Sequence, residues 1–124
     1  MTPPLALLLY EKLLPGSQLA NRLQDLNWRV EVVPNASALV KTAEEHKPLL
    51  VFADLVSTRK NIEAAITGIR RTESTKHIPV IAFTAEQDQK VFDVAITAGA
   101  TLVVSDTAIL QHLDQFIEQA LNDF

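Results

Sequence analysis

A chain of 124 residues has the length of one domain, and its 48% hydrophobic and 21% charged content is typical of a globular protein rather than a disordered one. The absence of cysteine excludes disulfide bonds and thiolate zinc sites and fits a reducing cytoplasm. A net charge of −4 disfavours direct binding to nucleic acid, and no apolar run approaches the roughly 20 residues of a membrane-spanning helix. We therefore expect one cytoplasmic domain over residues 1–124, without membrane contact.

The first apolar run, Leu5–Leu9, predicts a core strand, because the N-terminus lacks the basic region and cleavage site of a signal peptide. A helix is predicted over Pro15–Leu26, with three leucines on one face. These leucines are Leu19, Leu23 and Leu26. The second run, Trp28–Val33, alternates valine with Arg29 and Glu31. This alternation predicts a strand with one solvated face, as at the edge of a sheet.

The next segment predicts a helix that is capped at its start and stopped by a proline at its end. Asn35 or Ser37 is the expected cap, and the helix should end near His46, before Pro48. The third run, Leu49–Ala53, is apolar throughout, which predicts a strand buried on both faces.

The second half of the chain repeats the pattern. A helix is expected over about Asn61–Arg71, a strand over Ile78–Phe83 and a helix over about Asp88–Ala98 that stops at Gly99. A last strand is expected over Thr101–Val104. The helix over Asn61–Arg71 should carry Ile62, Ile66 and Ile69 on its inward face.

A final helix is expected to begin after a cap at Thr107. Its inward residues should be Ile109, Leu110, Leu113, Phe116, Ile117 and Leu121. The whole chain then forms five strand–helix units with mostly continuous apolar strands. Such strands predict an α/β protein with a parallel, doubly wound sheet that has helices on both faces.

Polar side chains follow four of the five predicted strands. Tyr10 and Glu11 follow the first, Asp54 the third, Thr84 the fourth and Ser105 the fifth. In doubly wound sheets the functional groups gather at the carboxyl ends of the strands. We therefore expect two carboxylates and two hydroxyls to meet in one cleft.

Three stretches, in this order, make the chain similar to a known family. They are PLLVFADL at 48–55, HIPVIAFTAE at 77–86 and the AGA of 98–100. Together with the spacing of the strand-end residues, they resemble the receiver domains of response regulators in two-component (phosphorelay) signalling. The resemblance implies a flavodoxin-like (βα)5 three-layer sandwich with the parallel strand order 2-1-3-4-5.

The resemblance also implies a role for several strand-end residues. Asp54 matches the aspartate that accepts a phosphoryl group, and Thr84 matches the hydroxyl that contacts the phosphoryl oxygens. The acidic pair that helps hold Mg²⁺ falls on Tyr10 and Glu11, so only one of the two is acidic. Mg²⁺ is therefore expected only if Glu11 and Asp54 supply its carboxylates.

Other matched positions depart from the family. The position of the charge-pairing lysine holds Ser105, the residue after it is Asp106, and the aromatic switch position holds Leu102. A hydroxyl next to a carboxylate brings no positive charge to a phosphoryl dianion. Arg59 or Lys60, in the loop after the third strand, are other candidates for the missing cation, although loop cations are usually solvated.

Each candidate has a structural interpretation beside the functional one. Asp54 can be an inherited acid satisfied by backbone N–H groups, and Glu11 a solvated loop residue. Thr84 can be a structural hydroxyl at the end of a strand, and Ser105 a residue that precedes a helix.

We therefore expect a pseudo-receiver that is not an enzyme and that acts on a protein partner, a histidine kinase or a downstream effector. Its interface, or a homodimer contact, should lie on the fourth helix, fifth strand and fifth helix, centred on Val91–Ala98 and Thr107–Phe116. One alternative is a working receiver phosphorylated on Asp54, with Glu11 holding Mg²⁺. Another is a small enzyme or nucleotide-binding domain, although Lys12–Ser17 contains only one glycine.

Three further features favour structural roles. Trp28 is expected to be a packing anchor, with a partner contact as the other interpretation. Arg70 and Arg71, with Lys76, are expected to form a solvated basic patch. No metal-ligand spacing relates the three histidines, His46, His77 and His112.

Overall fold

Five parallel strands form one sheet in the computed structural model, which describes residues 4–9, 13–33, 35–55, 59–84 and 89–122. The strand order is β2-β1-β3-β4-β5, as predicted. The strands are β1 (Leu5–Leu9), β2 (Arg29–Val33), β3 (Leu50–Asp54), β4 (Val80–Thr84) and β5 (Leu102–Ser105). The helices are α1 (Leu13–Asp25), α2 (Leu39–His46), α3 (Arg59–Arg71), α4 (Gln89–Ala98), α5 (Asp106–Gln111) and α6 (Leu113–Asn122).

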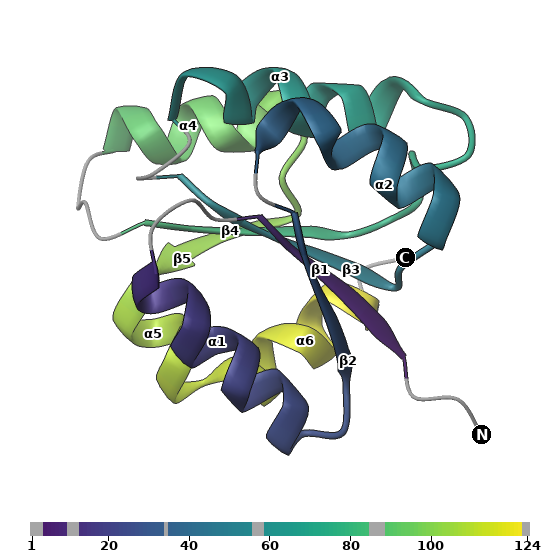
Figure 1. Cartoon of the computed structure of the whole chain (residues 1–124). Coiled ribbons are helices and arrows are strands. Elements are labelled where there is room, and N and C mark those ends of the chain that lie inside the picture. The colour runs from purple at the N-terminus through teal and green to yellow at the C-terminus, as the bar shows by residue number, and fades with distance from the viewer. Residues whose placement is uncertain (1–3, 10–12, 34, 56–58, 85–88, 123–124) are drawn as a thin grey trace.

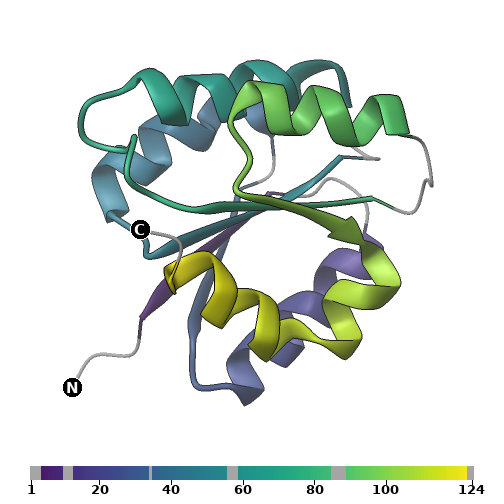
Figure 2. The same cartoon turned by 180° about the vertical axis from the view of Figure 1, so that it is seen from behind.

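The helices cover the sheet on both faces, and Figures 1 and 2 show the layers from opposite sides. Helices α2, α3 and α4 lie on one face and α1, α5 and α6 on the other. Two separate apolar clusters fill the space between sheet and helices, one on each face. The three isoleucines predicted to face inward from α3 are buried in the first cluster. Strands β3 and β4 are buried along their whole length, because both lie inside the sheet and are covered on both faces.

Strand β2 lies at the edge of the sheet, as its alternation predicts. The prediction of one solvated face is wrong in detail. Val33 is buried on the face that carries Arg29 and Glu31, whereas Val32 on the opposite face is 43% exposed. Trp28 precedes the strand and packs against the second cluster, which agrees with its interpretation as an anchor.

The first helix ends one residue earlier than predicted. Asn27 adopts a left-handed conformation with φ of 70°, and it closes the helix before Leu26 can join the inward face. Leu26 is exposed, whereas Leu19 and Leu23 are buried. Asn35 is a cap, as expected, because its side chain accepts a hydrogen bond from the Ala38 N–H at 3.1 Å. It caps a short 3₁₀ turn, η1 (Ala36–Ala38), that leads into α2.

The predicted final helix is two helices, and its predicted cap is wrong. His112 has non-helical backbone angles and separates α5 from α6. The N-cap of α5 is Ser105, not Thr107, because the extended backbone of Ser105 ends β5 and its hydroxyl reaches the helix. Leu121 is exposed instead of inward. Gly99 ends α4 with φ of 122°, the positive value expected at this position.

Candidate functional site

The carboxyl ends of neighbouring strands are level, and this brings the candidate residues to one edge of the sheet. In the register of the sheet, Asp54 of β3 pairs with Phe83 of β4, and Thr84 pairs with Ser105 of β5. Asp54, Thr84 and Ser105 therefore end three adjacent strands. Tyr10 and Glu11 lie outside the described residues; they follow Leu9, whose partner in the register is Ala53.

Asp54 and Thr84 are buried at this edge. Asp54 is 3% exposed and Thr84 is 1% exposed, and only one other polar residue of the described chain, Thr75, is buried to this degree. Neither side chain is without a partner. A carboxyl group and a hydroxyl group held in a sheet interior must be satisfied by polar contacts, because an unpaired buried polar group is costly.

Ser105 has a definite structural role. Its hydroxyl accepts a hydrogen bond from the Ala108 N–H at 3.1 Å, which satisfies one of the unpaired donors in the first turn of α5. Asp106 is the first residue of that helix, where a carboxylate is favourable near the partial positive charge of the N-terminus. The strand-end position therefore presents a hydroxyl and a carboxylate that stabilise a helix, and neither supplies a positive charge.

Leu102 is part of the apolar core. It is half-buried, packs against the second cluster and pairs in the register with Ile81. An aliphatic side chain in this place cannot donate a hydrogen bond to Thr84. Leu102 therefore cannot be coupled to Thr84 by a side-chain hydrogen bond.

The described residues do not make up a complete magnesium site. Mg²⁺ prefers near-octahedral oxygen ligands, with one or two protein carboxylates and several waters. Asp54 is a suitable carboxylate at the edge of the sheet, and the second candidate, Glu11, lies outside the described residues. Among the described residues no three or more His, Cys, Asp or Glu side chains cluster in a way that could hold a metal ion.

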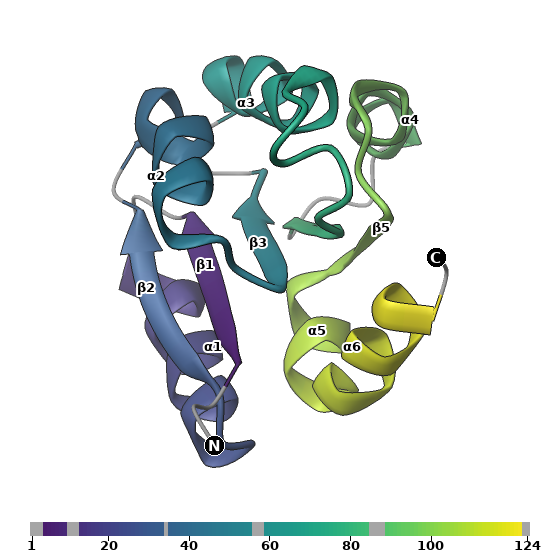
Figure 3. The same cartoon turned by 90° about the vertical axis from the view of Figure 1, so that its right-hand side faces the viewer.

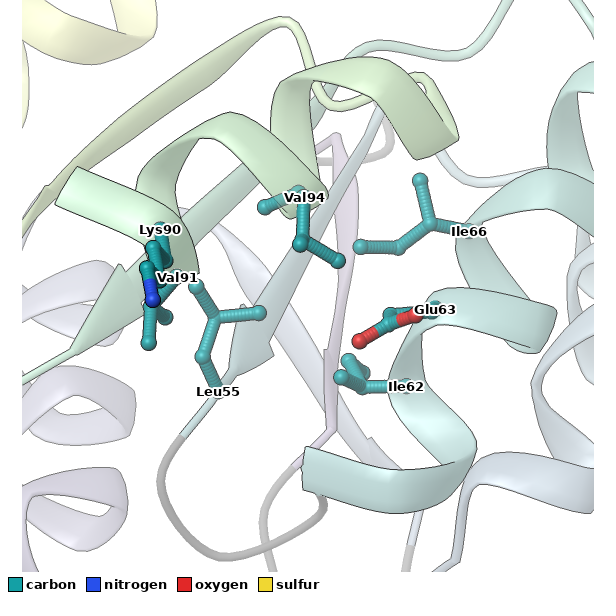
Figure 4. Close-up of a pocket in the computed structure, with 8 residues that line it drawn as sticks. Leu55, Ile62, Glu63, Ile66, Lys90, Val91 and Val94 are labelled. Atoms are coloured by element: carbon teal, nitrogen blue, oxygen red, sulfur yellow. The ribbon is translucent and has the colours of Figure 1, made fainter. Parts of the chain in front are cut away.

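A small apolar pocket lies beside the candidate site, between α3 and α4 (Figure 4). Leu55, which directly follows Asp54, lines the pocket together with Glu63 of α3 and Lys90 of α4. Its volume is about 100 Å³, whereas sites for drug-sized ligands and cofactors usually span about 300–1,000 Å³. This pocket is therefore too small for a nucleotide.

Arg70 is a structural residue that the sequence did not identify. Its guanidinium donates hydrogen bonds to the carbonyl oxygens of Gly99 at 2.7 Å, Ile78 at 2.6 Å and Lys76 at 2.9 Å, and to the Thr101 hydroxyl at 2.9 Å. It thereby ties the end of α3 to the segments that enter β4 and β5. Burial lowers the pKa of Arg70. The expected solvated basic patch is therefore wrong for this residue.

The fold matches that of solved receiver domains. A protein assigned as a response regulator from Chloroflexus aurantiacus aligns with a TM-score of 0.88 at 17% identity, covering 96% of this chain and 98% of that one. The receiver domain of a sensor histidine kinase from Pseudomonas aeruginosa, which has a magnesium ion in its active-site cleft, aligns with a TM-score of 0.86 at 20% identity, covering 96% and 98%. The receiver domain of NtrX from Brucella abortus aligns with a TM-score of 0.80 at 20% identity, covering 94% and 97%.

No family model matches the sequence, and no curated protein is significantly similar to it. At these low identities the structural likeness shows the fold alone, which is the flavodoxin-like fold of receiver domains. Within the described ranges, no helix has both the length and the apolar character needed to cross a membrane.

Proposed function

We propose that the chain is a pseudo-receiver, a signalling domain of the two-component type that acts on a protein partner without needing a phosphoryl group. The observation that carries this proposal is the state of Ser105. A receiver needs positive charge at the end of β5 to stabilise a phosphoryl dianion on the aspartate of β3. Here the position holds a hydroxyl that caps α5, followed by a carboxylate.

The core position Leu102 supports the same proposal. The family resemblance places the aromatic switch there, and a leucine packed in the second cluster has neither an aromatic ring nor a hydroxyl to respond to Thr84. Even a phosphorylated Asp54 would lack this route to the opposite surface of the domain. A domain of this kind signals through the shape and charge of its surface.

The proposed interface is the surface of α4, β5 and α5. Val91 and Ala95 of α4 are buried, and Val94 lines the pocket beside α3, whereas Ile96 lies on another side of the helix and is 51% exposed. The exposed Ile96 provides an apolar contact for a histidine kinase, a downstream effector or a second copy. The domain itself is not proposed to catalyse a reaction.

A working receiver is the second candidate, and one observation favours it. Asp54 and Thr84 end adjacent strands at the same edge, which is the arrangement that the phosphoacceptor and its hydroxyl partner require. In that case Asp54 and Glu11 would hold Mg²⁺, which would neutralise charge on the transferred phosphoryl group. A nucleotide-binding or enzymatic domain is the least supported, because the pocket beside the site is small.

The two leading candidates are separated by a phosphoryl mimic. The labelled domain is titrated with Mg²⁺ and then with beryllofluoride, and the backbone amide signals next to Asp54 and Thr84 are followed by NMR. A pseudo-receiver shows no saturable shift at these signals. A working receiver shows saturable shifts that the variant Asp54→Asn abolishes, and that result would reject our proposal.

A further inference from the structure

Among the residues that the structure describes, no strand pairs with the outer side of the edge strand β2. Figure 3 shows β2 at the outer edge of the sheet, beside β1. Five consecutive residue pairs, from Leu5 with Arg29 to Leu9 with Val33, join the two strands, so the described β2 has no bulge. It also contains no proline. Natural sheets usually protect such edges with bulges, prolines or charges, because an open edge is a template for another strand.

The backbone groups on that open side belong to two valines. The Arg29 N–H donates to the Pro4 carbonyl at 2.8 Å, so the polar groups of Arg29 point toward β1. In a parallel ladder these directions alternate along a strand. The groups of Glu31 and Val33 therefore also point toward β1, and those of Val30 and Val32 point outward.

The side chains of β2 alternate between the two faces of the sheet, and those on one face carry opposite charges. Arg29 and Glu31 lie on the same face as their partners Leu5 and Leu7, and they carry opposite charges two residues apart. Glu31 is held on this face near His46, with 3.3 Å between His46 Nδ1 and Glu31 Oε2. Val32, on the other face, is 43% exposed.

We propose that β2 is a homodimer interface, in which the β2 strands of two copies pair antiparallel and extend the sheet across both. The outward groups restrict the hydrogen-bonded pairs of such a ribbon to three registers: Val30 with Val30, Val30 with Val32, or Val32 with Val32. The second register places Glu31 opposite Glu31 of the other copy. The third places Glu31 opposite Val33.

Only the register centred on Val30 places opposite charges across the ribbon. It places Arg29 of each copy opposite Glu31 of the other, and the two-fold symmetry makes this pair twice. Both pairs occupy non-hydrogen-bonded positions, where facing side chains of an antiparallel ribbon are closest. The exposed Val32 then faces Trp28 of the other copy, so an apolar pair covers the opposite face of the ribbon.

This interface is distinct from the α4, β5 and α5 surface of the proposed function and does not depend on it. The two surfaces lie at opposite edges of the sheet, since the order β2-β1-β3-β4-β5 places β2 and β5 at its two ends. Variants of one edge therefore leave the other unchanged, and an experiment can separate them. One short ribbon is a small contact, so the expected association is weak.

The test uses charge reversal and sedimentation velocity on the full chain, at protein concentrations up to about 1 mM, which covers weak association. Arg29→Glu places two carboxylates opposite each other, and Glu31→Arg places two guanidinium groups opposite each other. Each variant alone is expected to dimerise at least about tenfold more weakly than the natural chain. An equimolar mixture of the two variants restores both pairs and is expected to dimerise again.

Two variants serve as controls. Lys41→Glu changes the net charge as much as Arg29→Glu, but at an exposed position of α2, and should leave the dimer unchanged. Ile96→Asp alters the α4 surface and should also leave it unchanged. As a second readout, hydrogen exchange of the Val30 and Val32 amides should slow as the protein concentration rises.

Three results would overturn the proposal. The first is a chain that stays monomeric over the whole concentration range. The second is a dimer that forms equally well in both charge-reversal variants, or one that the variants lose and that mixing them does not restore. The third is a dimer that Ile96→Asp abolishes while the β2 variants retain it, which would place the contact at α4 instead.

Discussion

The cap at Ser105 makes a graded prediction about stability. The change Ser105→Ala removes the acceptor of the Ala108 N–H, whose hydrogen bond at 3.1 Å is half-buried. Replacing an N-cap serine with alanine typically costs about 1 kcal/mol, with a range of about 0.5–2 kcal/mol. In a domain of this size, 1 kcal/mol corresponds to about 4 °C in melting temperature. Ser105→Asn retains a capping oxygen and should be nearly neutral.

The assay is urea unfolding followed by circular dichroism, with the midpoint converted to a free energy of unfolding at constant slope. Thr107→Ala is the matched control, because Thr107 is an exposed residue two positions further on and its hydroxyl donates to the Asp106 carboxylate at a long 3.5 Å. This control should change stability by less than about 0.5 kcal/mol. The reverse order, with Thr107→Ala costly and Ser105→Ala neutral, would refute the assignment of the cap.

Two further predictions concern the contacts of Arg70. Arg70→Lys keeps a positive charge but loses the planar group that reaches several acceptors at once, so it should destabilise the domain by about 2–3 kcal/mol in the same urea assay. Arg71→Lys, at an exposed position, should cost less than about 0.5 kcal/mol. Equal midpoints for the two variants would show that the hydrogen bonds of Arg70 do not matter. Gly99→Ala should be destabilised by about 2 kcal/mol or more in thermal unfolding, because its φ is 122° and an added Cβ would lie 2.3 Å from Arg70 Cγ. A melting temperature within about 1 °C of Thr97→Ala, on exposed α4, would contradict this.

The order of the sheet and the meeting of its strand ends follow from local patterns in the sequence. The continuous apolar runs Leu50–Ala53 and Val80–Phe83 are buried on both faces, as is typical of strands in a parallel sheet between two helical layers. Once the strands are parallel, Asp54 and Thr84 must lie at the same edge. These two residues could therefore be placed from the sequence without knowledge of any distance.

The cap of α5 could not be chosen from the sequence. Ser105 and Thr107 are both common N-cap residues, two positions apart, and either can precede the same apolar periodicity. The choice depends on where β5 ends, and β5 ends where Ser105 pairs with Thr84 of the neighbouring strand. A tertiary contact between residues 21 positions apart decides this local feature.

The role of Arg70 was hidden for a similar reason. Three of the four acceptors of Arg70 are backbone carbonyl oxygens. Because every residue carries such an oxygen, no pattern of side chains in the sequence identifies these acceptors. One signal was present in the sequence, the glycine at Gly99, which was interpreted only as a helix end. The close approach of Arg70 to that glycine is a second reason for a residue without a Cβ.

The exposed apolar residues Leu26 and Val32 show a further limit of periodicity. Each falls on the expected apolar spacing of its element, but Leu26 lies beyond the end of α1 and Val32 lies on the open edge of the sheet. Periodicity identifies which face of an element is apolar. It does not tell how far the neighbouring elements extend over that face.

The central claim is that the end of β5, where Ser105 and Asp106 stand, supplies no positive charge to hold a phosphoryl group on Asp54. The most direct test supplies that charge. The natural chain, Ser105→Lys and Ser105→Met are each incubated with acetyl phosphate and Mg²⁺, and phosphoryl uptake is measured by intact-protein mass spectrometry. The methionine variant has a long side chain without charge and controls for length and for loss of the cap.

We predict that only Ser105→Lys takes up a phosphoryl group, and that adding Asp54→Asn to it abolishes the uptake. A natural chain that is phosphorylated on Asp54 to the same extent as Ser105→Lys would contradict the account, because the charge at this position would then be unnecessary.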